Sequence, residues 1–219
     1  VIITDITFSN SKVLKEFDNN GNLDSFETPE GLCFGFDGHL YVCDKTKGRI
    51  IEFDTELKYV RAIENPQKEL LPDGFTFTPC AVGVDKWGTV YCISDSSTNG
   101  YLQFSKEGVF KGFMGSPKTT LTLSQKFWRS IQTKEQRDRT ENAVPINFNN
   151  LVVDEGGFVY TTEANPNKES TALAIQGGEK SGLFMPIKKF NFNGSDVLKR
   201  QDFFAPAGDI SFEKSIPEN

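Results

Sequence analysis

Four positions along the chain carry side chains that could bind a metal ion or a ligand, each at the start of an apolar segment. Three of them offer oxygen atoms: Glu30, Asn149 or Asn150, and Asp209. Carboxylate and amide oxygens are the ligands that hard cations such as Ca²⁺ prefer. The fourth position holds Cys80, which offers no oxygen ligand. Asn and Asp are also ordinary turn residues, so a calcium site and simple turns both stay open at this stage.

The other residue types used in catalysis form no compact constellation. The 1 histidine of the chain, His39, follows Asp37 and Gly38 in an expected turn and should face solvent. One histidine argues against sites that need several His ligands or a His acid–base pair. The sequence also has no Gly-x-Ser-x-Gly elbow and no phosphate-binding Gly-rich loop. We therefore assign no catalytic residue from the sequence.

The 4 cysteines form no C-x-x-C pair, which argues against a structural zinc site. Cys33 and Cys43 flank the turn at Gly38, so their thiols should lie near each other across one hairpin. An oxidising compartment would permit a disulfide there, whereas small buried thiols are the commoner outcome. The sequence alone leaves both outcomes open.

Residues 116–147 carry apolar side chains at helical spacing and interrupt the pattern of the rest of the chain. The segment is locally positive on an acidic protein. One interpretation is a helix that packs over the domain with its charges solvated. Another is a helix beside a binding site, because long insertions in compact domains are often functional. The residues of its candidate binding surface are Trp128, Arg129, Arg137 and Arg139.

The composition is that of a packed, strand-rich domain. Of the 219 residues 37% are hydrophobic and 25% are charged, and 20 phenylalanines are spread along the whole length, which suits pleated surfaces. A net charge of −6 argues against a general nucleic-acid binder, which needs positive surface. No apolar run approaches the roughly 20 residues needed to cross a bilayer, so the sequence contains no membrane segment.

A repeated pattern organises the chain. Segments 28–44 and 78–94 both begin with Thr-Pro, continue as a short apolar strand, turn at a glycine and return as a strand that carries a tyrosine. Segment 150–160 repeats the strand, the turn and the tyrosine. Proline belongs at the first position of a strand because it cannot donate to the ladder. Asp and Gly supply the tight reversal between antiparallel strands.

Two further short strands are expected after each of these hairpins. They cover 49–53 and 59–63, then 101–104 and 109–113, then 187–192 and 197–200. Four short strands in a unit of about 40 residues are typical of propeller blades. The sequence therefore predicts an all-β fold, a β-propeller of four-stranded blades with one helical insertion.

The two ends of the sequence resemble parts of the same unit. Val1–Asp5 matches the second strand of a blade, with third and fourth strands over 12–17 and 23–26, and Pro206–Phe212 matches an opening strand. We expect one propeller domain over residues 1–219 that begins and ends within a blade, with the helical insertion at about 116–147. Either the two ends complete one shared blade and close a small ring, or the domain is part of a larger propeller, which is the interpretation we favour.

The first copy of the pattern resembles the NHL repeat. The resemblance rests on Thr-Pro-Glu-Gly-Leu at 28–32, Asp-Gly at 37–38, Leu-Tyr-Val-Cys-Asp at 40–44 and Gly-Arg-Ile-Ile-Glu-Phe-Asp at 48–54. It covers most of the chain outside 116–147 and 164–182, and the later copies lack the Arg and the second Asp. The chain is also similar to extracytoplasmic NHL-repeat proteins of Gram-positive bacteria. The resemblance implies a propeller that binds protein, RNA or other ligands, outside the cytoplasm or at the cell surface.

Our leading hypothesis is a non-enzymatic module that binds a protein, small-molecule or carbohydrate ligand without a cofactor. Its binding residues would be Glu30, Asn149, Asn150 and Asp209, where the loops that enter the blades converge on the axis. The alternative resembles the gluconolactonase propellers, a calcium-dependent hydrolase with Glu30, Asn150 and Asp209 as metal ligands. RNA binding through the basic residues of 116–147 is a third hypothesis, which the acidic composition disfavours.

Overall fold

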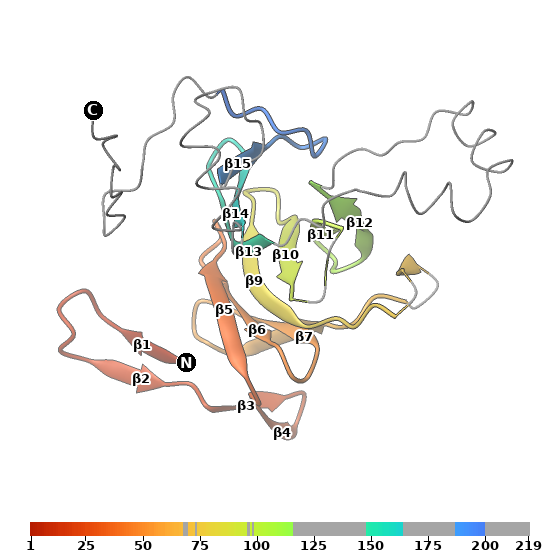
Figure 1. Cartoon of the computed structure of the whole chain (residues 1–219). Coiled ribbons are helices and arrows are strands. Elements are labelled where there is room, and N and C mark those ends of the chain that lie inside the picture. The colour runs from red at the N-terminus through yellow and green to blue at the C-terminus, as the bar shows by residue number, and fades with distance from the viewer. Residues whose placement is uncertain are drawn as a thin grey trace, which may run out of the picture. The chain divides into compact units, whose positions relative to one another are not determined.

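The computed structural model describes residues 1–67, 70–72, 74–95, 97, 99–115, 148–163 and 187–199. Within them the chain forms strands β1 to β15 and no helix (Figure 1). The strands belong to one of two units, made of residues 1–164 and 186–198. The other unit, residues 165–185 and 199–219, lies outside the described residues except for Lys199.

The first complete sheet is an antiparallel meander of four strands in the order β5-β6-β7-β8. Its strands are β5 (Pro29–Phe34), β6 (Leu40–Asp44), β7 (Arg49–Phe53) and β8 (Tyr59–Ile63). The turn between β5 and β6 contains Gly38 at φ +82°, a conformation that glycine adopts without steric cost. The meander begins at the proline and reverses at the glycine, as the sequence predicts.

The second sheet repeats this meander in the order β9-β10-β11-β12. Its strands are β9 (Pro79–Val84), β10 (Val90–Ser94), β11 (Tyr101–Phe104) and β12 (Phe110–Met114). The last strand begins one residue later than the predicted 109–113.

The third sheet contains β13 (Phe148–Val153), β14 (Val159–Glu163) and β15 (Ile187–Phe190). Its β15 is shorter than the predicted 187–192. The fourth strand expected at 197–200 is represented by one antiparallel bridge, between Phe190 and Asp196.

The N-terminal residues form two hairpins, β1 (Ile2–Thr4) with β2 (Ser11–Val13), and β3 (Glu16–Asn19) with β4 (Asn22–Ser25). Backbone bonds continue the pairing through the two residues that join the hairpins. These two residues are Leu14 and Lys15. The N–H of Leu14 donates to the carbonyl of Val1, and the carbonyl of Lys15 accepts from the N–H of Phe26. The two hairpins form separate two-stranded sheets at the segments where the sequence predicts the second, third and fourth strands of a blade.

The strands that open the three sheets, β5, β9 and β13, lie side by side, and we call them the inner strands. A Cβ at Gly31 of β5 would overlap the carbonyl oxygen of Cys80 and lie 2.7 Å from Ala81 Cα in β9. A Cβ at Gly83 of β9 would lie 2.6 Å from the Leu151 side chain in β13. Glycine at these two positions allows neighbouring inner strands to approach closely.

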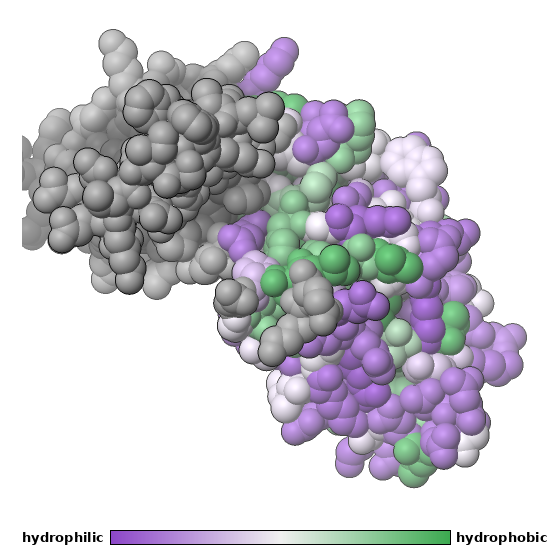
Figure 2. All heavy atoms as spheres, turned by 90° about the vertical axis from the view of Figure 1, so that its right-hand side faces the viewer, coloured by the Kyte–Doolittle hydropathy of each residue, from purple (hydrophilic) through white to green (hydrophobic). Residues whose placement is uncertain are grey.

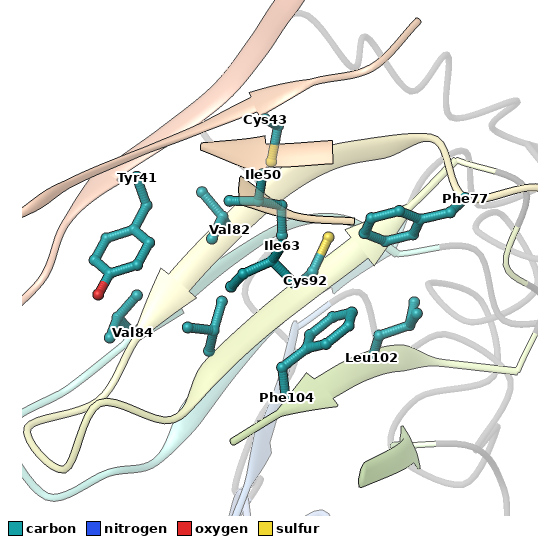
Figure 3. Packing of buried hydrophobic residues seen from close by; sticks show 11 residues of the cluster. Tyr41, Cys43, Ile50, Ile63, Phe77, Val82, Val84, Cys92, Leu102 and Phe104 are labelled. Carbon is teal, nitrogen blue, oxygen red and sulfur yellow. The ribbon is translucent and has the colours of Figure 1, made fainter. Parts of the chain in front are cut away.

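Three apolar clusters hold the sheets together. The first lies between the first and second sheets and includes Cys43, Ile50, Val82 and Leu102 (Figure 3). The second joins the second and third sheets, and the third joins the N-terminal hairpins to the first sheet. Full burial of a side chain such as Ile50 contributes about 1.5–3 kcal/mol. Each sheet is thus stabilised mainly by its neighbours, as in a repeat architecture.

Four-stranded antiparallel meanders with adjacent inner strands and apolar contacts between successive sheets are the blades of a β-propeller. The predicted fold is confirmed at this level. The predicted helical insertion at about 116–147 lies outside the described residues, as does the predicted strand at 206–212. No helix in the described part of the chain has the length and apolar character needed to cross a membrane.

The cysteines are free thiols: Cys43 and Cys92 lie in the first cluster, Cys33 packs against it, and Cys80 packs against the second cluster. Cys33 is paired with Tyr41 across the hairpin, so Cys33 and Cys43 do not lie directly opposite each other. Burial raises the pKa of the Cys33 thiol to about 12, which keeps it protonated at neutral pH. The structure therefore shows buried thiols, the second of the two outcomes left open by the sequence.

Candidate functional site

Each inner strand has a bulge next to its first residue. The pairing register shifts between Pro29 and Leu32 in β5, opposite Ile93 and Ser94 in β9, and between Phe148 and Asn150 in β13. A bulge turns a side chain out of the regular alternation and is common beside functional sites. The bulges place Glu30, Cys80 and Asn149 at equivalent positions of neighbouring strands. We call this end of the sheets the entry end.

Lys45 occupies the entry end between the first and second sheets. Its Nζ lies 2.9 Å from Asp95 Oδ2 and 3.0 Å from Glu30 Oε2. The Asp95 carboxylate, followed by that of Glu30, raises the pKa of Lys45. The ammonium group therefore stays charged and takes the place beside Glu30 that a metal ion would need.

Cys80 fills the equivalent position of the second sheet and supplies no oxygen ligand. Its Sγ donates to the carbonyl of Ile93 at 3.4 Å. Burial raises the pKa of the thiol to about 12. The neutral thiol at this position is neither a nucleophile nor a ligand for a hard cation at neutral pH.

In the third sheet the entry end carries two exposed asparagines. Asn149 Oδ1 accepts a hydrogen bond from Thr162 Oγ1 at 2.5 Å, and Asn150 Oδ1 accepts one from the Leu151 N–H at 2.9 Å. Both amide oxygens thus have partners within their own sheet. Asp209 lies outside the described residues, as do the predicted surface residues Trp128, Arg129, Arg137 and Arg139.

The opposite end of the inner strands carries a repeated arrangement of Asp and Tyr. Asp85 accepts hydrogen bonds from the backbone N–H groups of Trp87 and Thr89, at 2.9 and 2.8 Å, and from the Tyr91 hydroxyl at 3.2 Å. In the third sheet Asp154 likewise accepts from the Phe158 N–H and the Tyr160 hydroxyl. Each aspartate fixes the turn after its inner strand and satisfies the tyrosine of the next strand.

The first sheet departs from this arrangement because Gly35 stands where the other two sheets have Asp. Asp37 fills the vacant space: its Oδ1 accepts from the His39 N–H at 3.1 Å, and a Cβ on Gly35 would lie 2.6 Å from it. His39 Nδ1 lies 2.8 Å from Glu52 Oε1, and Arg61 Nε donates to Glu52 Oε2 at 2.5 Å. The His39 side chain is 28% exposed, so it faces solvent only in part and is held on its other side by Glu52.

Asp37, His39 and Glu52 bring three potential metal-ligand atoms within 4.8 Å of one another. The Glu52 side chain is only 7% exposed and is shared by His39 and Arg61. The Arg61 guanidinium compensates the charge of this buried carboxylate, so a cation would have to displace an existing ion pair. The geometry is that of a satisfied polar network, which the sequence could not reveal because Glu52 and Arg61 lie on other strands.

A groove of about 810 Å³ lies between the second and third sheets at the end that carries the Asp turns. This volume lies within the range of about 300–1,000 Å³ that is usual for small-molecule sites. Aromatic side chains make much of its wall: Trp87, Tyr91, Phe158 and Phe192. We call it the aromatic groove.

Trp87 and Phe192 are exposed aromatic residues at this groove, with exposed fractions of 61% and 76%. The Trp87 ring packs against Gly157 of the third sheet, where a Cβ would lie 2.6 Å from Cζ3 of the indole. Gly157 also has φ +79°, so a turn glycine makes room for the indole between the two sheets. Lys86 Nζ lies 4.7 Å from the centroid of the Trp87 ring.

Two polar side chains at the groove, those of Lys189 and Asn191, can donate hydrogen bonds to a ligand. Lys189 Nζ lies 4.1 Å from the Phe158 ring centroid and 5.0 Å from that of Tyr160, and no ion pair of Lys189 is found among the described residues. Asn191 Oδ1 accepts from the N–H groups of Asn193 and Ser195 at 3.1 and 3.0 Å. These bonds fix the orientation of the Asn191 side-chain amide, so its Nδ2 donor is directed away from the backbone of Asn193 and Ser195.

The sequence analysis did not identify this groove. It treated the turns at 85–89 and 154–158 only as strand reversals. The available signal was Trp87, a large aromatic residue at the turn position that holds Asp37 in the first sheet and Gly156 in the third. Figure 2 shows one face of the molecule, on which hydrophilic residues surround a smaller area of hydrophobic ones.

No protein-family profile and no curated protein sequence matches this chain. Solved structures do resemble it. A streptogramin B lyase shares 13% identity with a TM-score of 0.45 over 83% of this chain and 42% of its own. A gluconolactonase from Xanthomonas campestris shares 13% with a TM-score of 0.44 over 80% and 47%. A chain of a nidogen–laminin complex shares 12% with a TM-score of 0.42 over 81% and 53%.

These three proteins are β-propellers, and the likeness concerns the fold alone. The chain spans about half the length of the structures that it resembles, or less. The fold assignment follows from the sheets of the chain itself, and the function has to be argued from its own side chains.

Proposed function

We propose that this chain is a non-enzymatic binding module of the NHL-repeat propeller type that takes its ligand in the aromatic groove. The observation that carries the proposal is the groove itself, about 810 Å³ in volume, with the exposed rings of Trp87 and Phe192 at its wall. Exposed apolar surface rimmed by polar groups marks interaction sites, because its exposure is otherwise unfavourable. The NHL assignment rests on the residues of the first repeat, which also favour an extracytoplasmic protein of a Gram-positive bacterium.

The entry end supports the alternative, a calcium-dependent gluconolactonase-like hydrolase, less well. A metal site at Glu30, Asn150 and Asp209 would have to displace Lys45 from Glu30, and Cys80 interrupts the set of oxygen ligands. The oxygen of Asn150 is also engaged with the backbone of Leu151. We propose the entry end only as a secondary contact surface, where a partner would meet the solvent-exposed parts of Glu30, Asn149 and Asn150 together with the predicted position Asp209.

The test is a comparison of binding and turnover on the same preparations. Wild-type protein, Trp87→Ala and Phe8→Ala are screened against a glycan array and a small-molecule library by thermal shift. Phe8 is the matched control, because its ring is 81% exposed on the β1–β2 hairpin. We expect a ligand that raises the Tm of the wild type and of Phe8→Ala but not of Trp87→Ala.

Lactone hydrolysis is measured in parallel with and without Ca²⁺. Turnover that requires Ca²⁺ and disappears in Glu30→Gln would contradict the binding module and establish the hydrolase. Ligands that stabilise Trp87→Ala as well as the wild type would move the binding site away from the groove.

A further inference from the structure

We propose that the aromatic groove binds an acidic carbohydrate, a short oligosaccharide that contains uronic acid. This inference rests on the proposed function and names the ligand class of the same site. It follows from three properties of the groove: exposed aromatic walls, the amide donor of Asn191 and the ammonium group of Lys189, which has no ion-pair contact among the described residues.

The walls suit sugar rings. Trp87 and Phe192 expose broad ring surfaces, and Trp87 is held in place by its packing against Gly157 and by the backbone bond from its N–H to Asp85. A ring presented in a fixed position can stack on the apolar C–H face of a sugar with little loss of side-chain entropy. The size of the groove allows more than one sugar unit.

Two acceptor groups of the groove, on Asp85 and Asn191, are already engaged. Asp85 is 4% exposed and accepts three hydrogen bonds, from Trp87, Thr89 and Tyr91. The oxygen of Asn191 accepts two backbone bonds, which leaves its amide nitrogen as a donor. A ligand rich in acceptors therefore matches the groove better than one rich in donors.

The ammonium group of Lys189 favours an anion at the groove. Lys189 lies beside the Phe158 and Tyr160 rings, interacts electrostatically with Asp154 and has no ion-pair contact within 4.0 Å in the described part of the chain. Lys86 lies over the Trp87 ring but is not among the residues that line the groove. A carboxylate on the ligand would complement the Lys189 ammonium group with a charge-assisted hydrogen bond.

The test uses trigalacturonate, an alginate trisaccharide and galactotriose, the neutral counterpart of the first. Binding of each to the wild type is measured by isothermal titration calorimetry at low and at raised salt. We expect the acidic trisaccharides to bind at least about tenfold more tightly than galactotriose, with an affinity that falls as salt screens the charges.

Two variants locate the interaction. Lys189→Gln should weaken the acidic trisaccharides about tenfold while leaving the affinity for galactotriose unchanged, because the substitution removes charge and keeps a polar side chain. Lys12→Gln is the matched control, since Lys12 lies on an exposed strand of the N-terminal hairpins. Its affinities should equal those of the wild type. The Tm of each variant checks that the fold is retained.

The outcomes separate this inference from the proposed function. Equal affinity for acidic and neutral trisaccharides, or an unchanged affinity in Lys189→Gln, overturns the acidic class while the groove remains a binding site. Absence of binding by either acidic trisaccharide also overturns the inference. In that case a different ligand whose stabilising effect depends on Trp87 would still support the proposed function, and the absence of any such ligand would remove both.

Discussion

The entry end and the aromatic groove lie at opposite ends of the same inner strands. They differ in whether their polar side chains have interaction partners within the chain. At the entry end Lys45 is held by Glu30 and Asp95, and the side chains of Cys80 and Asn149 have partners within their sheets. At the groove Lys189 has no ion-pair partner among the described residues, and Trp87 and Phe192 are exposed.

The difference shows how a repeat architecture creates a site. Each copy of the hairpin places a side chain at the same point, but the chemistry depends on what the neighbouring copy supplies. At the entry end the next sheet supplies Asp95, which completes an ion pair with Lys45. At the groove the next sheet supplies Gly157, which has no side chain and leaves space beside Trp87. The predictions below test this contrast between the entry end, which is closed in the sense that Lys45 occupies it, and the aromatic groove, which is open to a ligand.

The largest expected effect comes from adding a methyl group at a glycine of each region. Gly31→Ala should lower the free energy of unfolding by about 1–3 kcal/mol, because its Cβ meets the backbone of Cys80 and Ala81, which cannot yield without separating two sheets. Gly157→Ala should cost roughly 1–2 kcal/mol from its positive φ. Urea denaturation of the two variants checks the order.

Gly157→Ala should also displace the indole of Trp87 and weaken any ligand of the groove, whereas Gly31→Ala should leave that ligand unaffected. The contrast fails if Gly157→Ala is the more destabilising of the two, or if it binds ligand as the wild type does.

A smaller effect on stability is expected when Lys45 is removed from the entry end. Lys45→Met leaves the Glu30 and Asp95 carboxylates without their cation, but the pair is partly exposed, so the change in stability should stay within about 1 kcal/mol. The two carboxylates should then bind Ca²⁺ more tightly than the wild type does. Calorimetric titration with Ca²⁺ measures this, and Lys58→Met, at an exposed Lys–Glu pair, is the control. Equal Ca²⁺ affinity in wild type and Lys45→Met would show that Lys45 does not block the site.

The smallest perturbation is chemical and leaves the sequence unchanged. Burial raises the pKa of Cys80 from the ordinary 9.0 to about 12, so the thiol is protonated at every pH well below that value. At pH 8 its alkylation by iodoacetamide should be on the order of a hundredfold or more slower than that of an unstructured cysteine, and the rate should rise with pH. Mass spectrometry of the native protein measures this rate at Cys80, with the denatured protein as reference. A rate at Cys80 equal to that of the denatured chain would contradict the closed entry end.

The fold was largely predictable because its signals are local. Alternating apolar residues and turn glycines set the strands, so Arg49–Phe53 and Tyr101–Phe104 have the predicted bounds. The site was less predictable. The equivalence of Glu30, Cys80 and Asn149 followed from the repeat, but the ion pair at Lys45 joins residues of two sheets, and no local pattern indicates it. The pairing of His39 was missed for the same reason, since its partner Glu52 lies on another strand.

The sequence by itself determined the repeat and the order of strands within the sheets. These depend on the period of side chains along a strand and on turns of a few residues. The tertiary structure alone decided that Lys45 bridges Glu30 and Asp95, that His39 pairs with Glu52 and that Trp87 stands over a glycine of the next sheet. Such contacts depend on how neighbouring sheets pack, and the distance between two sheets is set by side chains far apart in the sequence.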